Sequence, residues 1–392
     1  MRPVKINMRI LPAILAFSMT VAFSDFASDK VNTLRVPEGG IQPQAVVDAK
    51  GGVHLIYFKG DPANGDIFYV KLSPDGAKFS KPIQVNSNAE SAIAVGNVRG
   101  PHIAIGKNER VHVAWMGSGK APKGPNNSNP MLYTRLTDDG SAFEPERNVM
   151  QFATGLDGGG TVAADPNGNV IVTWHANPAK DGEINRQVWL ARSSDEGKSF
   201  KREEPAISQQ TGACGCCGMS ALADGKGDVF ILYRSARGAK MPDIRDMFLL
   251  TSKDKGATFS GADLHPWKLP MCAMSTANLS ETSNGALAAW ETKGQVYFCH
   301  IDAQKQAQPI GAPGAGTGRK HPAVAGNAAG EVLLAWTNGM GWQKGGSVEW
   351  QVYGKDGAPA PATADKGKTD GVPANSVITA FTRPDGGFTI IY

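Results

Sequence analysis

Residues 168–174 read GNVIVTW, a glycine-led turn followed by an alternating apolar run that ends in an aromatic residue. The same arrangement recurs six more times along the chain. The other copies are GGVHLIY ending at Tyr57, ERVHVAW at Trp115, GDVFILY at Tyr233, GALAAW at Trp290, GEVLLAW at Trp336 and GGFTIIY at Tyr392. Short alternating runs between Gly, Asp and Asn turns are typical of β-strands. The sequence therefore predicts seven copies of one strand-rich unit.

The terminal aromatic residues of successive copies lie 46 to 59 residues apart, a period that suits a four-stranded propeller blade with long loops. We predict an all-β, seven-bladed β-propeller with very little helix. The chain ends inside its last copy, while residues 31–37 read as an unattached strand, so we expect the N-terminal strand and the C-terminal hairpin to close the ring together. A six-bladed ring with one hairpin packed outside is the alternative.

The N-terminus has the pattern of a secretory signal peptide. Arg2, Lys5 and Arg9 precede an apolar run over residues 10–23, and small residues follow it. We assign residues 1–27 to the signal peptide and 28–392 to the propeller, and expect a periplasmic or secreted protein with no membrane span after cleavage.

Charge gives no support for a nucleic-acid partner. Loss of the three basic residues before the apolar run leaves 37 Lys and Arg (40 minus 3) against 36 Asp and Glu. No basic stripe with interleaved aromatic residues is visible, so we expect a monomer that binds no nucleic acid.

A second motif follows the third strand of several copies. Residues 193–200 (SSDEGKSF) and 252–259 (SKDKGATF) match the Asp-box pattern S-x-D-x-G-x-[ST]-[FW], and shortened forms surround Asp75, Asp139 and Asp356. In this turn the Asp side chain accepts backbone hydrogen bonds and the Gly takes a positive φ, so the box indicates fold and not chemistry. On these motifs the chain resembles the sialidase and BNR-repeat superfamily over its mature length.

The resemblance implies a site near the propeller axis, where D-to-A connections and B-to-C loops converge. Sialidases bind the substrate carboxylate with three arginines, the first in an R-x-P motif that Arg99-Gly-Pro101 matches. We expect Arg99, Arg234 and Arg319 to bind an acidic sugar, with Arg237 as an alternative to Arg234. The other axial candidates are His175, His321 and Trp342.

The resemblance also implies catalytic carboxylates, for which Asp157 is the candidate acid/base and Glu291 the candidate base or nucleophile. The family's Tyr nucleophile has no counterpart, because the seven tyrosines fall at core positions or in third strands. The sequence therefore favours an exo-acting glycoside hydrolase but leaves open a non-catalytic propeller that binds a glycan or protein partner, and a metal or redox protein.

The cysteines are concentrated at two strand starts. Cys214, Cys216 and Cys217 open the fourth copy and Cys272 opens the fifth, while Cys299 falls in a third strand as a buried free thiol. In an exported protein disulfides are the default, so we expect Cys272 to pair with one member of the C-x-C-C group, or Cys216 with Cys217. The alternative is a Cu or Zn site made by the same four sulfurs.

Overall fold

The computed structural model describes residue 1 and residues 29–392 except 178, 240, 284 and 302–307. The expected signal peptide lies almost wholly outside these described residues. Within them, no helix is long and apolar enough to cross a bilayer.

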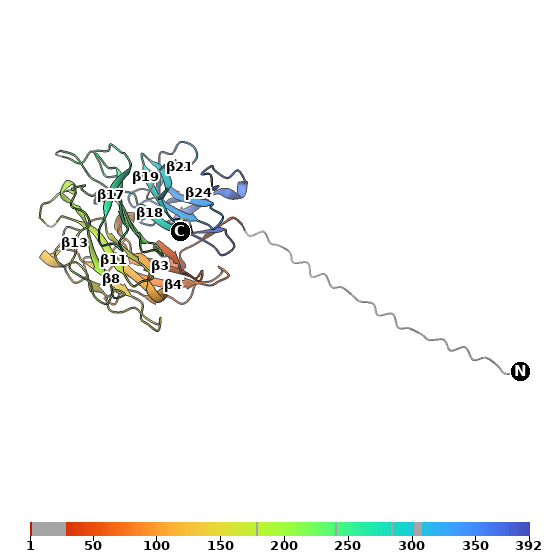
Figure 1. Ribbon diagram of the computed structural model, residues 1–392, viewed down its shortest axis with the longest axis horizontal. Coiled ribbons are helices and arrows are strands. Elements are labelled where there is room, and N and C mark those ends of the chain that lie inside the picture. The colour runs from red at the N-terminus through yellow and green to blue at the C-terminus, as the bar shows by residue number, and fades with distance from the viewer. Residues whose placement is uncertain (2–28, 178, 240, 284, 302–307) are drawn as a thin grey trace.

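Six antiparallel sheets of four strands each follow one another around a ring, and a seventh sheet of three strands closes it (Figure 1). We name the strands of each blade A to D from the axis outward. Blade 1 contains β2 (Ile41–Val47), β3 (Val53–Asp61), β4 (Asn64–Leu72) and β5 (Ile83–Gln84). Blade 2 contains β6 (His102–Ile105), β7 (Val111–Met116), β8 (Met131–Arg135) and β9 (Arg147–Asn148). Blade 3 contains β10 (Gly160–Ala164), β11 (Val170–Ala176), β12 (Gln187–Ser193) and β13 (Glu204–Pro205).

The second half of the ring repeats this order. Blade 4 contains β14 (Ser220–Ala223), β15 (Val229–Arg234), β16 (Met247–Ser252) and β17 (Ser260–His265). Blade 5 contains β18 (Asn278–Thr282), β19 (Gly285–Thr292), β20 (Gln295–Ile301) and β21 (Ile310–Gly311). Blade 6 contains β22 (Arg319–Gly326), β23 (Val332–Asn338), β24 (Gly346–Tyr353) and β25 (Lys366–Val372).

The closing blade joins the two ends of the chain. β26 (Thr379–Thr382) and β27 (Phe388–Ile391) form its hairpin, and β1 (Val31–Leu34) runs parallel to β27 with Val31 opposite Phe388 and Leu34 opposite Ile391. The predicted seven blades and the predicted closure are therefore confirmed, and the six-bladed alternative is wrong.

Helix in the described part of the chain is limited to short 3-10 turns. They are η1 (Pro37–Gly39), η2 (Val95–Asn97), η3 (Lys107–Glu109), η4 (Pro125–Asn127), η5 (Glu183–Asn185) and η6 (Thr363–Asp365). This agrees with the low helix content expected from the sequence.

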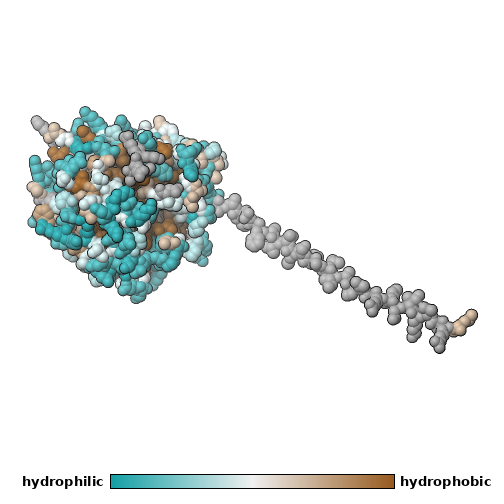
Figure 2. Space-filling view, viewed as in Figure 1, coloured by the Kyte–Doolittle hydropathy of each residue, from teal (hydrophilic) through white to brown (hydrophobic). Residues whose placement is uncertain are grey.

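The repeat aromatic residues form the core between blades. Tyr57, Trp115, Trp174 and Trp290 have no exposed surface, and the other three copies are 2 to 7% exposed. Two histidines occupy the same repeat position three residues earlier, and each ring Nδ1 lies 2.7 Å from a tyrosine hydroxyl of the neighbouring strand: His54 with Tyr69 and His112 with Tyr133. Polar side chains cover most of the outer surface seen in Figure 2. Burial of the large aromatic side chains at the repeat positions is the main stabilising contribution to the closed arrangement of blades.

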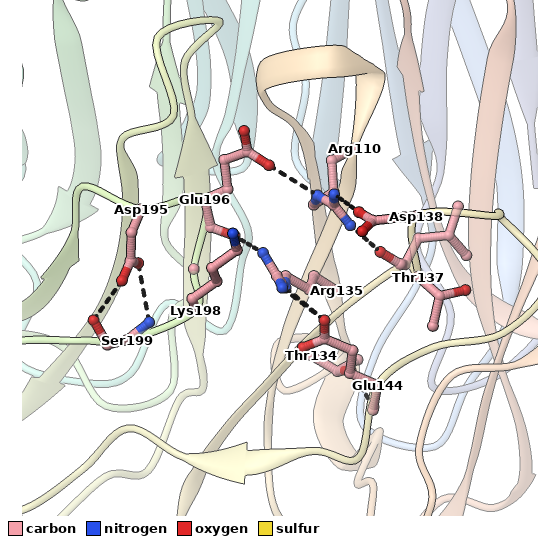
Figure 3. Close-up of polar contacts among 12 residues, drawn as sticks. Arg110, Thr134, Arg135, Thr137, Asp138, Glu144, Asp195, Glu196, Lys198 and Ser199 are labelled. Carbon is pink, nitrogen blue, oxygen red and sulfur yellow. Dashed lines mark hydrogen bonds and ion pairs between the residues drawn. The ribbon is translucent and has the colours of Figure 1, made fainter.

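The Asp boxes connect strands C and D at the end of the ring opposite to the D-to-A connections. In blade 3, Ser193 Oγ and the Ser199 backbone N–H donate to Asp195 Oδ1 at 2.6 and 3.0 Å. The box also binds the preceding blade, since Arg135 Nη1 donates to the Glu196 carbonyl at 2.8 Å and Arg110 pairs with the Glu196 carboxylate at 3.2 Å (Figure 3). These Asp residues therefore have a structural role.

Candidate functional site

The innermost strands of all seven blades enclose a channel of 310 Å³ lined mostly by Ala, Val and Thr. Toward the D-to-A connections the channel narrows to a space of 30 Å³ beside Gln42, His102 and Pro322. That space holds about one water molecule. A larger ligand would therefore bind above the constriction, on the surface that we call the axial face.

A chain of ion pairs crosses this face from blade 2 to blade 4. Arg99 Nη2 donates to Asp157 Oδ1 at 2.7 Å and Arg99 Nε donates to the Asp157 carbonyl at 2.6 Å. The other carboxylate oxygen of Asp157 lies 3.5 Å from Arg186, whose Nη1 is 3.7 Å from Glu183. Glu183 also accepts from Arg245 at 2.7 Å. The side chain of Asp157 is 42% exposed, so it is the carboxylate of this network that a ligand can reach.

The cysteine loop lies against this network. A Cβ at Gly215 would overlap Arg186 Nη1 and Asp157 Oδ2, so a larger residue at the second position of C-G-C-C would displace these two side chains. The Gly215 backbone N–H donates to Glu183 at 2.7 Å. The spacing of this motif therefore places the thiols beside the axial carboxylates.

Four thiols converge here. Cys214 Sγ lies 3.3 Å from Cys216 Sγ and 3.2 Å from Cys217 Sγ, and the three sulfurs all lie within 4.8 Å of one another. Cys216 and Cys272 form a second group with Glu183 under the same limit. A hydrogen bond from Cys214 holds the pKa of Cys217 below its ordinary value, and the charge of Arg234 acts in the same direction.

The disulfide expected from the sequence is not confirmed. All five cysteines are free thiols, and the 3.2 Å between Cys214 and Cys217 exceeds the S–S bond length of about 2.05 Å. Neither the expected bond from Cys272 to the C-x-C-C group nor the vicinal Cys216–Cys217 bond is formed in the structure. Cys299 is buried in β20, as expected.

Glu291 and Arg234 lie on the other side of Cys217. Arg234 donates to the Glu291 carbonyl and to the Arg245 carbonyl, its Nη2 is 3.9 Å from Glu291 Oε2, and it stacks on Trp267 at 4.7 Å. Glu291 is 1% exposed, and burial raises the pKa of its carboxyl. One of its oxygens accepts from the Gly294 N–H, while Oε2 has no hydrogen-bond partner among the described residues. Glu291 is therefore a buried acid that a ligand reaches only if the surrounding loops move.

Two predicted histidines are buried beside this site. Burial lowers the pKa of His175 to about 4 and that of His321 to about 3, so both rings are neutral at neutral pH. His175 is 2% exposed and neither ring nitrogen has a partner. His321 Nδ1 lies 3.3 Å from Thr276 Oγ1.

The remaining predicted residues separate into two places. The exposed indole of Trp342 is placed against Gly96 next to Arg99 Nη1, so it reaches the axial face from blade 6. Arg237 pairs with Asp246 and Asp263, and Arg319 donates to Gln295 and stacks on Trp336 at 4.8 Å. Within the described residues, the contacts of Arg319 include neither Arg99 nor Arg234, so the structure does not bring these three guanidiniums into mutual contact.

Three residues of the axial ion-pair network were missed by sequence reasoning: Glu183, Arg186 and Arg245. Arg186 comes one residue before strand C of blade 3, and Arg245 comes two residues before strand C of blade 4. Both form ion pairs with Glu183. The matched placement of an arginine before two successive third strands was the available signal.

All seven tyrosines are used in blade packing, as the sequence indicated. Tyr57, Tyr69, Tyr133, Tyr233, Tyr353 and Tyr392 are buried core residues, and Tyr297 packs on His265 at 4.5 Å. The axial face thus carries carboxylates, guanidiniums and thiols, and no tyrosine.

No family model matches this sequence, and no curated protein matches it either. Among solved structures, a protein of unknown function from Dyadobacter fermentans aligns with a TM-score of 0.51 and 17% identity, over 79% of this chain and 93% of that chain. An α-L-arabinanase from Penicillium chrysogenum aligns with a TM-score of 0.50 and 11% identity, over 78% and 90% of the two chains. A Hadza microbial sialidase aligns with a TM-score of 0.50 and 13% identity, over 82% and 70%. These similarities show a shared propeller fold.

Proposed function

We propose that this sialidase-like β-propeller is a carbohydrate-active protein that binds an acidic sugar on its axial face. The observation that carries the proposal is the juxtaposition of the exposed Trp342 ring, the Arg99 guanidinium and the half-exposed Asp157 carboxylate. A flat aromatic surface beside a few oriented polar groups is the usual composition of a site for a small polar ligand.

Charge favours an acidic sugar over a neutral one. Five cationic side chains lie at or just below the axial face: Arg99, Arg186, Arg234, Arg245 and Lys320. Three carboxyl groups lie in the same place: Asp157, Glu183 and Glu291. The excess of positive charge, with a planar guanidinium at the rim, suits a carboxylate ligand.

Glycoside hydrolysis is the second candidate function, because Asp157 and Glu291 occupy different environments. Asp157 is half-exposed between two arginines, whereas burial raises the pKa of Glu291. Glycoside hydrolysis uses two carboxyl groups whose different environments give them different pKa values. In this case Asp157 would act as the acid/base and Glu291 as the base or nucleophile.

A glycan panel tests both functions when binding and product release are measured on the same samples. Replacing Trp342 by Ala should weaken binding of an acidic sugar by about tenfold without a change in Tm, because the ring is 55% exposed. Asp157→Asn should retain binding, because it removes negative charge beside Arg99 and leaves the guanidinium in place. The matched control is Asp370→Asn, whose side chain is 84% exposed on β25.

The outcomes separate the candidates. Product release by the wild type that is lost in Asp157→Asn and Glu291→Gln establishes hydrolysis, and binding without product establishes recognition alone. No interaction of the wild type with any acidic sugar would contradict both.

A further inference from the structure

The thiol cluster has no part in the proposed sugar site and no disulfide to explain it. Cys214, Cys216 and Cys217 come from one loop at the start of blade 4, and Cys272 comes from the start of blade 5. Two of these thiols, Cys214 and Cys217, are buried, and Cys272 is exposed. Three sulfurs facing one point with no bond among them form a set of soft ligands.

The arrangement favours three-coordinate binding. The group of mutually close sulfurs is Cys214, Cys216 and Cys217, whereas Cys272 falls in the second group with Cys216 and Glu183. A structural Zn(II) site needs four ligands at tetrahedral positions around one point. Within the described residues this first group holds three thiolates and no fourth ligand, since Cys272 interacts with Cys214 and Cys216 but lies outside the group. Three thiolates suit Cu(I), which soft sulfur ligands select.

The surroundings stabilise the negative charge of such a site. One Cu(I) ion bound by three thiolates carries a net charge of minus two. Arg234 and Arg245 are buried beside the cysteines, at 3% and 2% exposure. Arg245 donates through Nη2 to Glu183, while its buried Nη1 has no hydrogen-bond partner among the described residues. A buried cationic donor without an acceptor is costly, and a bound anionic centre would supply the missing charge.

We propose that Cys214, Cys216 and Cys217 bind one Cu(I) ion as a trigonal thiolate site at the axial face. Binding replaces three S–H protons, which pass to solvent, by three S–Cu bonds, and the oxidation state of copper does not change. Cys272 is exposed and forms the second group with Glu183 and Cys216. Because Cys216 belongs to both groups, the second group provides the entry path for the ion from solvent.

The test is an anaerobic titration of the reduced full-length protein with Cu(I) against a chromophoric Cu(I) chelator. We expect one Cu(I) per chain in the wild type. Cys216→Ser should lower the affinity by roughly 100-fold or more, whereas Cys272→Ser should keep the stoichiometry and slow loading. Cys299→Ser is the matched control, because Cys299 lies in β20 away from the cluster.

A second measurement keeps the proposal testable if a cysteine variant fails to fold. Bound Cu(I) should protect three of the five wild-type thiols from alkylation, identified by peptide mass spectrometry as Cys214, Cys216 and Cys217. Equal Cu(I) binding by Cys216→Ser, or no binding by the reduced wild type, would overturn the site. Stoichiometric Zn(II) that Cu(I) does not displace would overturn the choice of ion.

Discussion

His112 and His321 are single residues at which burial sets the ionisation state. The pKa of each is lowered to about 3, first by desolvation and then by neighbouring cations: Arg110 and Arg135 at His112, and Lys320 at His321. Both are at most 3% exposed. Because an unfolded histidine has a pKa near 6.5, the two states bind different numbers of protons over a wide pH range.

This difference predicts an acid-sensitive fold. Between pH 6.5 and about 3 the unfolded chain binds protons that the folded chain does not, so the free energy of unfolding falls as pH falls. Each histidine contributes about 1.4 kcal/mol per pH unit in that interval. Urea denaturation at several pH values measures the slope, which His112→Gln should reduce. An unchanged slope in that variant would contradict the assignment. His300→Gln serves as the comparison and should change the slope less, because His300 is exposed and burial lowers its pKa only in part.

At this scale the sequence predicted structural roles better than functional ones. His54 and His112 share a position three residues before the terminal aromatic of their repeats, which indicates a structural role, and each lies 2.7 Å from a tyrosine hydroxyl of the neighbouring strand. Arg186 and Arg245 had a signal in their placement before two third strands, but the ion pairs that join them could not be predicted, because Glu183 lies in η5, within a loop that has no repeat spacing.

The Asp box is the element that joins neighbouring blades. Arg135 and Arg192 hold the same repeat position, and each donates to carbonyls of the box in the next blade: Glu196 for Arg135, and Ala257 for Arg192 at 3.0 Å. Hydrogen bonds from Thr258 and Ser252 lower the pKa of Asp254 to about 2, which keeps this box carboxylate ionised. The sequence predicted these turns because their hydrogen bonds are local. It did not predict the contact between blades.

Two box glycines give a matched test of that contact. Gly76 and Gly197 both have positive φ, at 71° and 77°. A Cβ at Gly76 would meet no atom within 4 Å, whereas a Cβ at Gly197 would overlap the hydroxyl of buried Tyr133. Gly76→Ala should therefore cost about 1 kcal/mol from backbone strain alone, and Gly197→Ala about 1–3 kcal/mol more from overpacking. Chemical denaturation measures both, and equal losses would contradict the packing argument.

Ring closure belongs to the whole molecule, because it joins residues more than 330 positions apart in the sequence. Gln42 of blade 1 donates its backbone N–H to Ser376 Oγ at 3.1 Å and its Nε2 to the Asn375 carbonyl at 2.7 Å. Arg35 donates to the Asp370 carbonyl at 2.8 Å and lies 4.1 Å from the Tyr392 ring. The sequence predicted closure from the incomplete last copy. The structure adds the direction of this strand: β1 runs parallel to β27.

Truncation after Asp370 tests whether the ring is one cooperative unit. This change removes β26 and β27, leaves β1 without its partner strand, and uncovers the faces of blades 1 and 6 that pack on the closing blade. It also removes Phe388 and Ile390 from the core of blade 6, and Phe381 and Ile391 from that of blade 1. Both neighbours thus lose apolar burial on one face, so we expect aggregation and no cooperative thermal transition. Arg35→Ala, which weakens closure without removing a strand, should still fold and melt cooperatively at a lower Tm. A monomeric truncated chain with a sharp melting transition would show that six blades are stable alone.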